Sequence, residues 1–236
     1  MLMRLYEDRL PASGGPVYLP AVERALYVIE GEVAVEFATG CTNQAAGSAW
    51  LGSGEIALVP GSEGVRLARW ELACAPQTGE LRAAPSCVSQ LKLSADIEFA
   101  PGFDWLMRCD RVGFPKGGIA HTHVHQGPGI RYCLEGRIEI ESGGYTRCYG
   151  PGEAWFELGP TPVRAPTSTE TETTFVRVFV LPRGCRGRSS IRYVHPEDAA
   201  KPRVQRYKVL GERFIEMKDR CIATSQRDPR SSTSAH

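Results

Sequence analysis

Three of the five histidines in this 236-residue chain occupy alternate positions, at His121, His123 and His125. Successive side chains of a β-strand point to opposite faces, so these imidazoles would share one face of an extended segment. Neutral imidazoles bind Zn, Fe, Cu, Ni and Mn, which makes the segment a candidate metal site. The first and third rings would lie about 13 Å apart along a straight strand. We therefore expect two of the three to hold one divalent ion, namely His123 with His121 or His125, although the same face could hydrogen-bond water or a ligand without metal.

A carboxylate that could complete this site lies in the segment GEAWFELG, residues 152–159. Strand alternation places Trp155 and Glu157 on one face, so Glu157 points inward if Trp155 does. A buried carboxylate is costly unless it is paired or bound to a metal. Glu157 is therefore expected to be a metal ligand, a hydrogen-bond partner of a ligand histidine, or an exposed side chain that points outward. Two or three histidines with one carboxylate would resemble non-haem iron or manganese sites.

Two arginines could bind a substrate close to these groups. Arg131 follows the glycine-rich segment QGPG, and Arg177 lies within the apolar run FVRVFV. The planar guanidinium matches a carboxylate, so either side chain could clamp an acidic substrate. The alternative is that each pairs with a glutamate of the fold, because a buried charge needs a partner. The catalytic candidates are Glu157 and Arg131, and the substrate-binding candidates are Arg131, Trp155 and Arg177.

Composition excludes several classes of protein. Lys plus Arg is 28 and Asp plus Glu is 27, so there is no electrostatic case for a nucleic acid or an anionic membrane as partner. The eight cysteines form no CxxC pair, which argues against a zinc ribbon or a thioredoxin-like site. No apolar stretch has the length of a signal peptide or of a membrane span. We therefore expect a cytoplasmic protein with reduced thiols.

An internal repeat of about half the chain sets the architecture. ALYVIEGEVAVEF, from residue 25, resembles RYCLEGRIEIES, from residue 131, and GSGEIALVPGSEGVR, from residue 52, resembles GPGEAWFELGPTPVR, from residue 150. VAVEF and RIEIES alternate apolar and polar residues, as a strand with one buried face does. Closely spaced Gly and Pro turns favour a sandwich or barrel of short strands. The pattern predicts a duplicated all-β domain.

These residues resemble the motifs of the cupin superfamily. Gly117, His123, His125 and Gly136 follow the frame G-x5-HxH-x3-4-E-x6-G of the first motif, and GPGEAWFELGPTPV resembles the second motif in loose form. The resemblance covers most of residues 15–182 in two copies. It implies a bicupin: an all-β chain with two tandem jelly-roll-like antiparallel β-barrel domains. We place the N-terminal barrel at 1–85, with a linker at 76–87, the C-terminal barrel at 86–190, and an extension at 191–236 whose last ~10 polar residues are disordered.

The resemblance also implies where a metal would bind. In cupins two His and a Glu of the first motif and a His of the second hold the metal, but Gly129 and Val163 stand at the last two positions here. In the first copy none of the four ligands is present, which implies an N-terminal barrel without metal and with a structural role. The residues at its four positions are Tyr18, Pro20, Arg24 and Val65.

The implied function is that of a metal-dependent small-molecule enzyme of the bicupin type, with its site in the C-terminal barrel. Bicupins with one working barrel include ureidoglycine aminohydrolases, which use manganese, and several dioxygenases, so a hydrolase or a dioxygenase is expected with Mn, Fe, Ni or Zn. The alternative is a non-catalytic module that binds a sugar or carboxylate without stoichiometric metal. A strand expected from YKVL to RFIEM could cover an open sheet edge. Because cupins often pair through such edges, we also predict a homodimer.

Overall fold

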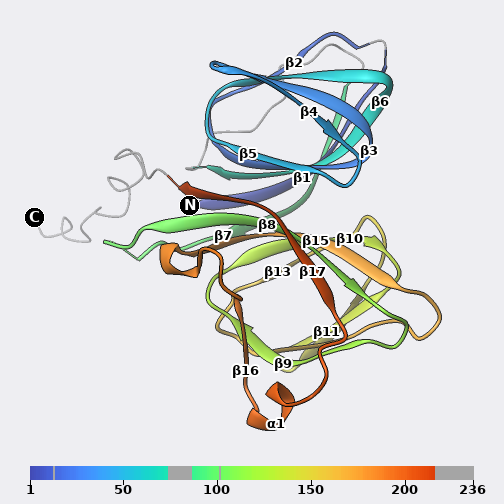
Figure 1. Ribbon diagram of the computed structural model, residues 1–236, viewed down its shortest axis with the longest axis vertical. Coiled ribbons are helices and arrows are strands. Elements are labelled where there is room, and N and C mark those ends of the chain that lie inside the picture. Colours follow the sequence, from blue (N-terminus) through green and yellow to red (C-terminus); the bar gives the residue numbers. More distant parts are fainter. Residues whose placement is uncertain (13, 74–86, 101, 216–236) are drawn as a thin grey trace, which may run out of the picture.

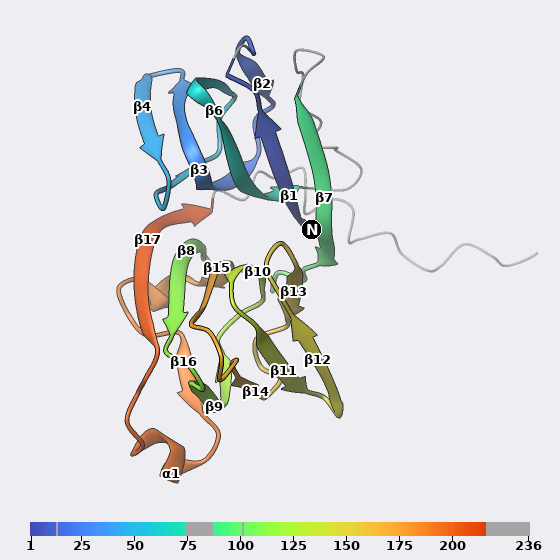
Figure 2. The ribbon, with the colours of Figure 1, turned by 90° about the vertical axis from the view of Figure 1, so that its right-hand side faces the viewer.

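The computed structural model describes residues 1–12, 14–73, 87–100 and 102–215. All of the predicted linker except Cys87, and the chain end for which disorder is predicted, lie outside the described residues. Figures 1 and 2 show two β-rich lobes joined end to end, with β1 to β7 mainly in one lobe and β8 to β17 in the other. Every strand pairing in the described part of the chain is antiparallel, which confirms the all-β prediction.

The N-terminal lobe is one seven-stranded sheet of order β4-β3-β6-β1-β7, in which β2 also pairs with β6 and β5 with β3. The long strands β3 and β6 each take part in several pairings, so the sheet curls around an apolar interior. The strands are β1 (Leu2–Leu10), β2 (Val17–Leu19), β3 (Glu23–Phe37), β4 (Gly40–Ala45), β5 (Ala49–Gly52), β6 (Ile56–Ala73) and β7 (Val88–Asp96).

The C-terminal lobe consists of two five-stranded sheets, of order β13-β10-β15-β8-β17 and β12-β11-β14-β9-β16. No helix in the described ranges is long and apolar enough to cross a membrane. The elements are β8 (Trp105–Phe114), β9 (Ile119–His125), β10 (Gly129–Glu135), β11 (Ile138–Ser142), β12 (Tyr145–Tyr149), β13 (Ala154–Glu157), β14 (Val163–Pro166), β15 (Thr173–Pro182), the 3-10 turn η1 (Arg183–Cys185), β16 (Ile191–Tyr193), α1 (Pro196–Ala199) and β17 (Arg206–Ile215).

Strand pairing crosses the predicted domain boundary at residue 86. β7 follows that boundary, yet it pairs antiparallel with β1 from Arg9 opposite Val88 to Leu2 opposite Asp96. This pairing satisfies the backbone groups along one edge of β1, which would otherwise lack hydrogen-bond partners. The change from one lobe to the other therefore comes after Asp96.

The C-terminal extension belongs to the second lobe. β16 pairs with β9, and β17 pairs with β8, with a bulge between Val209 and Gly211. The predicted strand from YKVL to RFIEM is thus one strand that covers an edge of its own chain. Because β17 covers the edge of β8 in its own chain, this edge is not open to a second copy, and the argument for a homodimer from this edge is lost. The homodimer itself stays a prediction.

A shared apolar core joins the lobes and explains why β15 is buried on both faces. Trp70 of the first lobe is fully buried and donates from Nε1 to Ile130 O over 3.1 Å. Val176 and Val178 of β15 pack in this shared core, whereas Phe175 packs in the interior of the second lobe. A sheet covered on both faces needs a nearly continuous apolar strand. This is why TTFVRVFVLP shows no simple alternation of apolar and polar residues.

Candidate functional site

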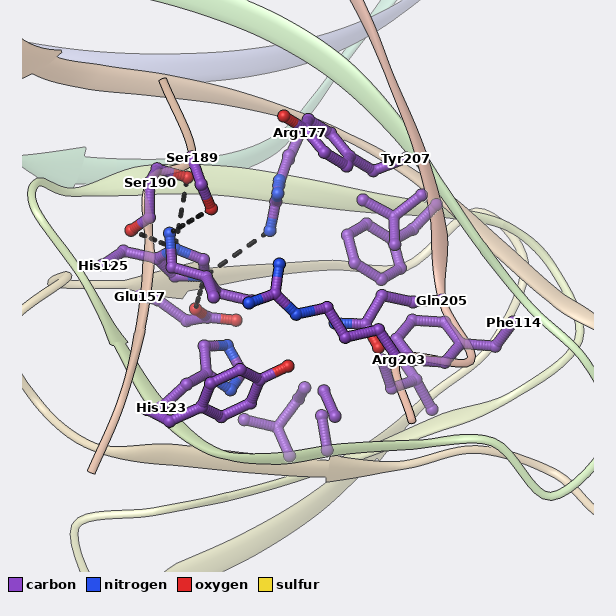
Figure 3. Close-up of a pocket in the computed structure, with 18 of the residues that line it drawn as sticks. Phe114, His123, His125, Glu157, Arg177, Ser189, Ser190, Arg203, Gln205 and Tyr207 are labelled. Carbon is purple, nitrogen blue, oxygen red and sulfur yellow. Dashed lines mark hydrogen bonds and ion pairs between the residues drawn. The ribbon is translucent and has the colours of Figure 1, made fainter. Parts of the chain in front are cut away.

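A cavity of about 150 Å³ lies inside the C-terminal lobe, between its two sheets (Figure 3). His123, His125, Glu157 and Arg177 face it from three strands, β9, β13 and β15. Its remaining walls are mainly apolar, with Val112, Phe114, Ala120, Ile138, Ile140 and Phe175 among them. The cavity therefore combines one polar cluster with an apolar surround, as small-molecule sites do.

The two cavity histidines are held in a defined orientation by backbone carbonyl groups. His123 Nδ1 lies 2.7 Å from His121 O, and His125 Nδ1 lies 3.2 Å from Ser190 O. A carbonyl oxygen only accepts hydrogen bonds, so each Nδ1 carries the proton and each Nε2 keeps its lone pair. The two ring centroids are 4.9 Å apart. Both imidazoles are thus in the tautomer that binds a metal, or accepts a proton, through Nε2.

Burial keeps both imidazoles neutral. Desolvation lowers the pKa of His125 well below 6.5, and the nearby guanidinium groups of Arg177 and Arg131 lower it further. Desolvation also lowers the pKa of His123, and it outweighs the opposite effect of the Glu157 carboxylate. At neutral pH both rings can therefore act as ligands or as hydrogen-bond acceptors.

His121 is directed away from the cavity by a bulge in β9. Val163 pairs with His123 and Ala165 with Ala120, so two residues of β9 lie opposite the single residue between Val163 and Ala165. A bulge of this kind interrupts strand alternation. As a result Ala120 joins His123 in the cavity wall, whereas His121 is part-exposed, with Nδ1 3.8 Å from Asp198 Oδ1. The expectation that His121 could share an ion with His123 is corrected by this geometry.

Glu157 lies where strand alternation predicts it, on the same buried face as Trp155. Its Oε1 accepts a hydrogen bond of 2.9 Å from Trp155 Nε1, and its Oε2 lies 2.6 Å from Arg131 Nη2 and 3.8 Å from His125 Nε2. The contact with Arg131 is an ion pair without the alignment of a hydrogen bond, so Oε2 is buried with no hydrogen-bond partner among the described residues. This oxygen already has one cationic neighbour, so a metal ion that bound it would share the carboxylate with Arg131.

Gly129 explains why a carboxylate comes from β13. Gly129 and Glu157 are direct cross-strand partners, so the two positions share one face of the sheet. A Cβ atom at Gly129 would lie 2.4 Å from Val178 O, which leaves no room for a side chain there. The carboxylate that this place cannot carry is thus supplied by the residue opposite.

The two candidate arginines are each committed to a carboxylate. Arg177 Nε lies 2.6 Å from Asp110 Oδ1, and its Nη1 lies 3.5 Å from His125 Nε2 at the cavity wall. Arg131 is 1% exposed and does not line the cavity; besides Glu157, it donates to Gly129 O over 2.5 Å. The expectation that Arg131 could touch a substrate is therefore corrected: this guanidinium acts on the cavity only through Glu157.

Comparisons with known proteins agree on the fold. No protein-family model matches the chain, and no curated protein sequence matches it. Similar solved structures include AerE from Microcystis aeruginosa, at 13% identity and a TM-score of 0.55 over 76% of this chain and 88% of that chain. A variant of oxalate decarboxylase from Bacillus subtilis has 11% identity and a TM-score of 0.59 over 84% of this chain and 74% of that chain. The chain has a bicupin fold.

A further structure of the Bacillus subtilis oxalate decarboxylase concerns the Mn(II) centres of that enzyme, and it matches this bicupin at 9% identity and a TM-score of 0.59, over 81% of this chain and 71% of that chain. At such identities the similarity establishes the fold. What the bicupin described here can bind follows from its own side chains.

The donor set of this bicupin fits a divalent metal in chemistry. Two neutral imidazoles and the buried Oε2 of Glu157 face one cavity. In the described part of the chain, however, no group of three or more His, Cys, Asp or Glu side chains is already arranged around one point. Ligand atoms that share an ion at about 2.1 Å lie roughly 3.0–3.5 Å apart at tetrahedral or octahedral angles. The 3.8 Å between His125 Nε2 and Glu157 Oε2 is slightly wider, so binding requires a small shift of these side chains.

Several cavity residues have no counterpart in the sequence expectations. They come from the extension of this bicupin and from the two residues before it, and β16 places Ile191 opposite His125 and Tyr193 opposite His123. A three-residue strand far along a polar segment gives no periodic signal, so nothing in its spacing indicates a site. Asp110 could have been identified from the sequence. It is the one carboxylate in the largely apolar strand WLMRCDRVGF, and a buried charge needs a partner of opposite sign, as Arg177 does. The cavity wall includes Ser189 and Ser190, which directly precede the extension, and Ile191, Tyr193, Arg203, Gln205 and Tyr207 of the extension.

Acid is expected to destabilise the metal-free protein through the cavity histidines. Their pKa values are below 6.5 in the folded state and return to about 6.5 in the unfolded chain. As the pH falls below 6.5, the unfolded chain binds protons that the folded state does not, so the free energy of unfolding decreases, by at most about 1.4 kcal/mol per pH unit for each histidine. Urea denaturation of EDTA-treated protein at several pH values measures this slope. His125→Gln should flatten it, and an unchanged slope in that variant would contradict the assignment.

Proposed function

We propose that this bicupin is a metal-dependent enzyme that acts on a small molecule in its C-terminal barrel. The observation that carries the proposal is the convergence of two neutral imidazoles and a buried carboxylate oxygen on one small cavity, where Nε2 is the acceptor of each ring and that of His125 lies 3.5 Å from Arg177 Nη1, which a metal would have to displace. The Mn(II) centres of oxalate decarboxylase, which shares the fold, support a divalent ion here. The cytoplasmic location of the protein also remains a prediction.

His123, His125 and Glu157 would hold the ion, which could be Mn, Fe, Ni or Zn. The ion would supply a Lewis acid or an activated water for a hydrolase, or a binding site for oxygen in a dioxygenase. Both reaction classes are compatible with this donor set. Consumption of oxygen during turnover would select the dioxygenase.

The chain's own side chains prepare the site. The Ser190 and His121 carbonyl groups fix the imidazole tautomers, and Arg131 and Trp155 fix the carboxylate of Glu157. Such outer partners orient ligands and raise their affinity for a metal. The apolar walls limit the entry of water, which strengthens polar interactions inside the cavity.

A second candidate function is a metal-free module that binds a small carboxylate. The observation in its favour is that Glu157 is already ion-paired with Arg131 at 2.6 Å, in a cavity whose donors are not preassembled around one point. In that case the imidazoles would accept hydrogen bonds from the ligand, and removal of His123 would change ligand affinity alone.

Elemental mass spectrometry of purified protein, after incubation with Mn, Fe, Ni or Zn and removal of excess metal, tests the proposal. We expect about one equivalent of metal in the wild type and well under half an equivalent in His123→Ala. His195→Ala is the matched control, because His195 is exposed and outside the cavity, and it should keep the wild-type stoichiometry. Less than half an equivalent in all three proteins would contradict the proposal and favour the metal-free module.

A further inference from the structure

The C-terminal extension closes one side of the cavity. β16 adds to the sheet that contains β9, and β17 adds to the sheet that contains β8, so residues 194–205 cross from one sheet to the other. Arg203 and Gln205 lie on this crossing segment and line the cavity. Figure 3 shows the Arg203 side chain extending over the cavity, with its guanidinium group directed toward the polar cluster.

Arg203 differs from the other two arginines at this site in its partners. Arg131 is paired with Glu157 and Arg177 with Asp110, each over 2.6 Å. Arg203 is exposed, its guanidinium lies 5.8 Å from the centre of the Tyr193 ring, and no carboxylate among the described residues is paired with it. The Arg131–Glu157 and Arg177–Asp110 pairs are each neutral overall. The side chains at the cavity therefore carry one net positive charge, that of Arg203.

We propose that Arg203 is the anchor for the carboxylate of an acidic substrate whose apolar part occupies the cavity. This inference rests on the proposed function, in which the cavity is the place where substrate binds. The excess charge selects an anion, and a planar guanidinium fork matches a carboxylate in two parallel hydrogen bonds. The apolar walls select an apolar body.

The volume limits the size of this substrate. A cavity of about 150 Å³ holds a molecule roughly as large as benzene. The substrate class is therefore a small carboxylic acid with a compact aliphatic or aromatic body. Phosphate esters are disfavoured, because a phosphate dianion carries more charge and more acceptor oxygens than one guanidinium fork matches, and neither a helix N-terminus nor a glycine loop is found among the described residues that line the cavity.

Titration calorimetry with benzoate and its neutral isostere benzamide tests the inference on metal-loaded and on EDTA-treated protein. We expect the wild type to prefer benzoate, and Arg203→Gln to weaken benzoate about tenfold or more without weakening benzamide. Arg203→Lys should keep part of the preference, since it keeps the charge and loses the fork. Arg192→Gln is the control: Arg192 is exposed on β16, pairs with Val124, and does not line the cavity, so this variant should bind as the wild type does.

Three outcomes would overturn the inference: no binding of benzoate or of the smaller isobutyrate to the wild type, equal binding of benzoate by the wild type and Arg203→Gln, or equal binding of phenyl phosphate and benzoate. Metal content is measured on the same samples. If the protein holds metal but Arg203→Gln does not change benzoate affinity, this inference is wrong and the proposed function remains. If the protein holds no metal but Arg203→Gln weakens benzoate binding, the proposed metal site is wrong and the role of Arg203 as carboxylate anchor remains.

Discussion

Glu157→Gln is expected to abolish metal binding and to lower the free energy of unfolding of the metal-free protein by about 3–5 kcal/mol. Arg131 is 1% exposed, and Glu157 is the carboxylate that neutralises it, over 2.6 Å. A neutral amide would leave that guanidinium buried without a counter-charge. The same change removes a negatively charged donor, and since loss of an outer partner alone costs about 10- to 100-fold in metal affinity, loss of a ligand should cost more.

The double variant Arg131→Met/Glu157→Gln separates these two effects. It removes the buried guanidinium together with its partner, so stability should return to within about 1–2 kcal/mol of the wild type. Metal binding should not return. Urea denaturation and metal titration measure the two quantities. Recovery of metal affinity in the double variant would show that Glu157 is no ligand and that Arg131→Met had relieved a merely structural defect.

Arg69→Met is expected to lower the free energy of unfolding by about 3–5 kcal/mol, although Arg69 is in the lobe without a candidate site. Its guanidinium is fully buried and pairs with Asp8 over 2.5 Å and with Glu71 over 2.7 Å. Glu71 also pairs with Arg24 over 2.7 Å. Removal of Arg69 would leave Asp8, also fully buried, without its cationic partner.

Arg66→Met provides the comparison for Arg69→Met. Arg66 is on the same strand, but its side chain is 27% exposed; it pairs with Glu30, whose side chain is 68% exposed, and lies 3.7 Å from the buried Glu7. Solvent screens the first pair, and Glu7 keeps Arg9 at 3.0 Å as a second cationic partner, so the loss should be about 1 kcal/mol and well below that of Arg69→Met. Denaturant unfolding of both variants tests the difference. Equal losses in the two would contradict the view that the buried ion pairs hold the first lobe together.

These ion pairs also show how the two halves of the repeat have diverged. Arg24 stands in the first copy where Gly129 stands in the second. Each of these two residues lies directly opposite a cross-strand partner on the neighbouring strand. In the first lobe that partner is Glu71, and the pair fills the place with charge. In the second lobe it is Phe179, and Glu157 and the imidazoles adjoin the cavity instead.

The sequence was sufficient to predict the features that follow from strand periodicity. The repeat and the alternation of short strands predict two antiparallel β domains, and alternation alone places Trp155 and Glu157 on one buried face. The spacing of His123 and His125 puts both on one wall. These features depend on residues close together in the chain, and the period of a strand determines where their side chains point.

Other features depend on pairing between distant segments, which one sequence does not display. The bulge that turns His121 outward arises in the pairing of β9 with β14. Arg131 forms an ion pair with Glu157, a carboxylate on another strand. Arg203 reaches the cavity because the extension crosses between two sheets. Spacing along the chain gives no access to such contacts.

A crystal of the wild-type protein soaked in Mn(II), with an anomalous difference map, tests the proposed metal site most directly. We expect one strong peak in the C-terminal barrel, about 2.0–2.3 Å from Nε2 of His123 and of His125 and from a carboxylate oxygen of Glu157. A map without a peak in this cavity, from crystals in which the same side chains are ordered, would contradict the metal site.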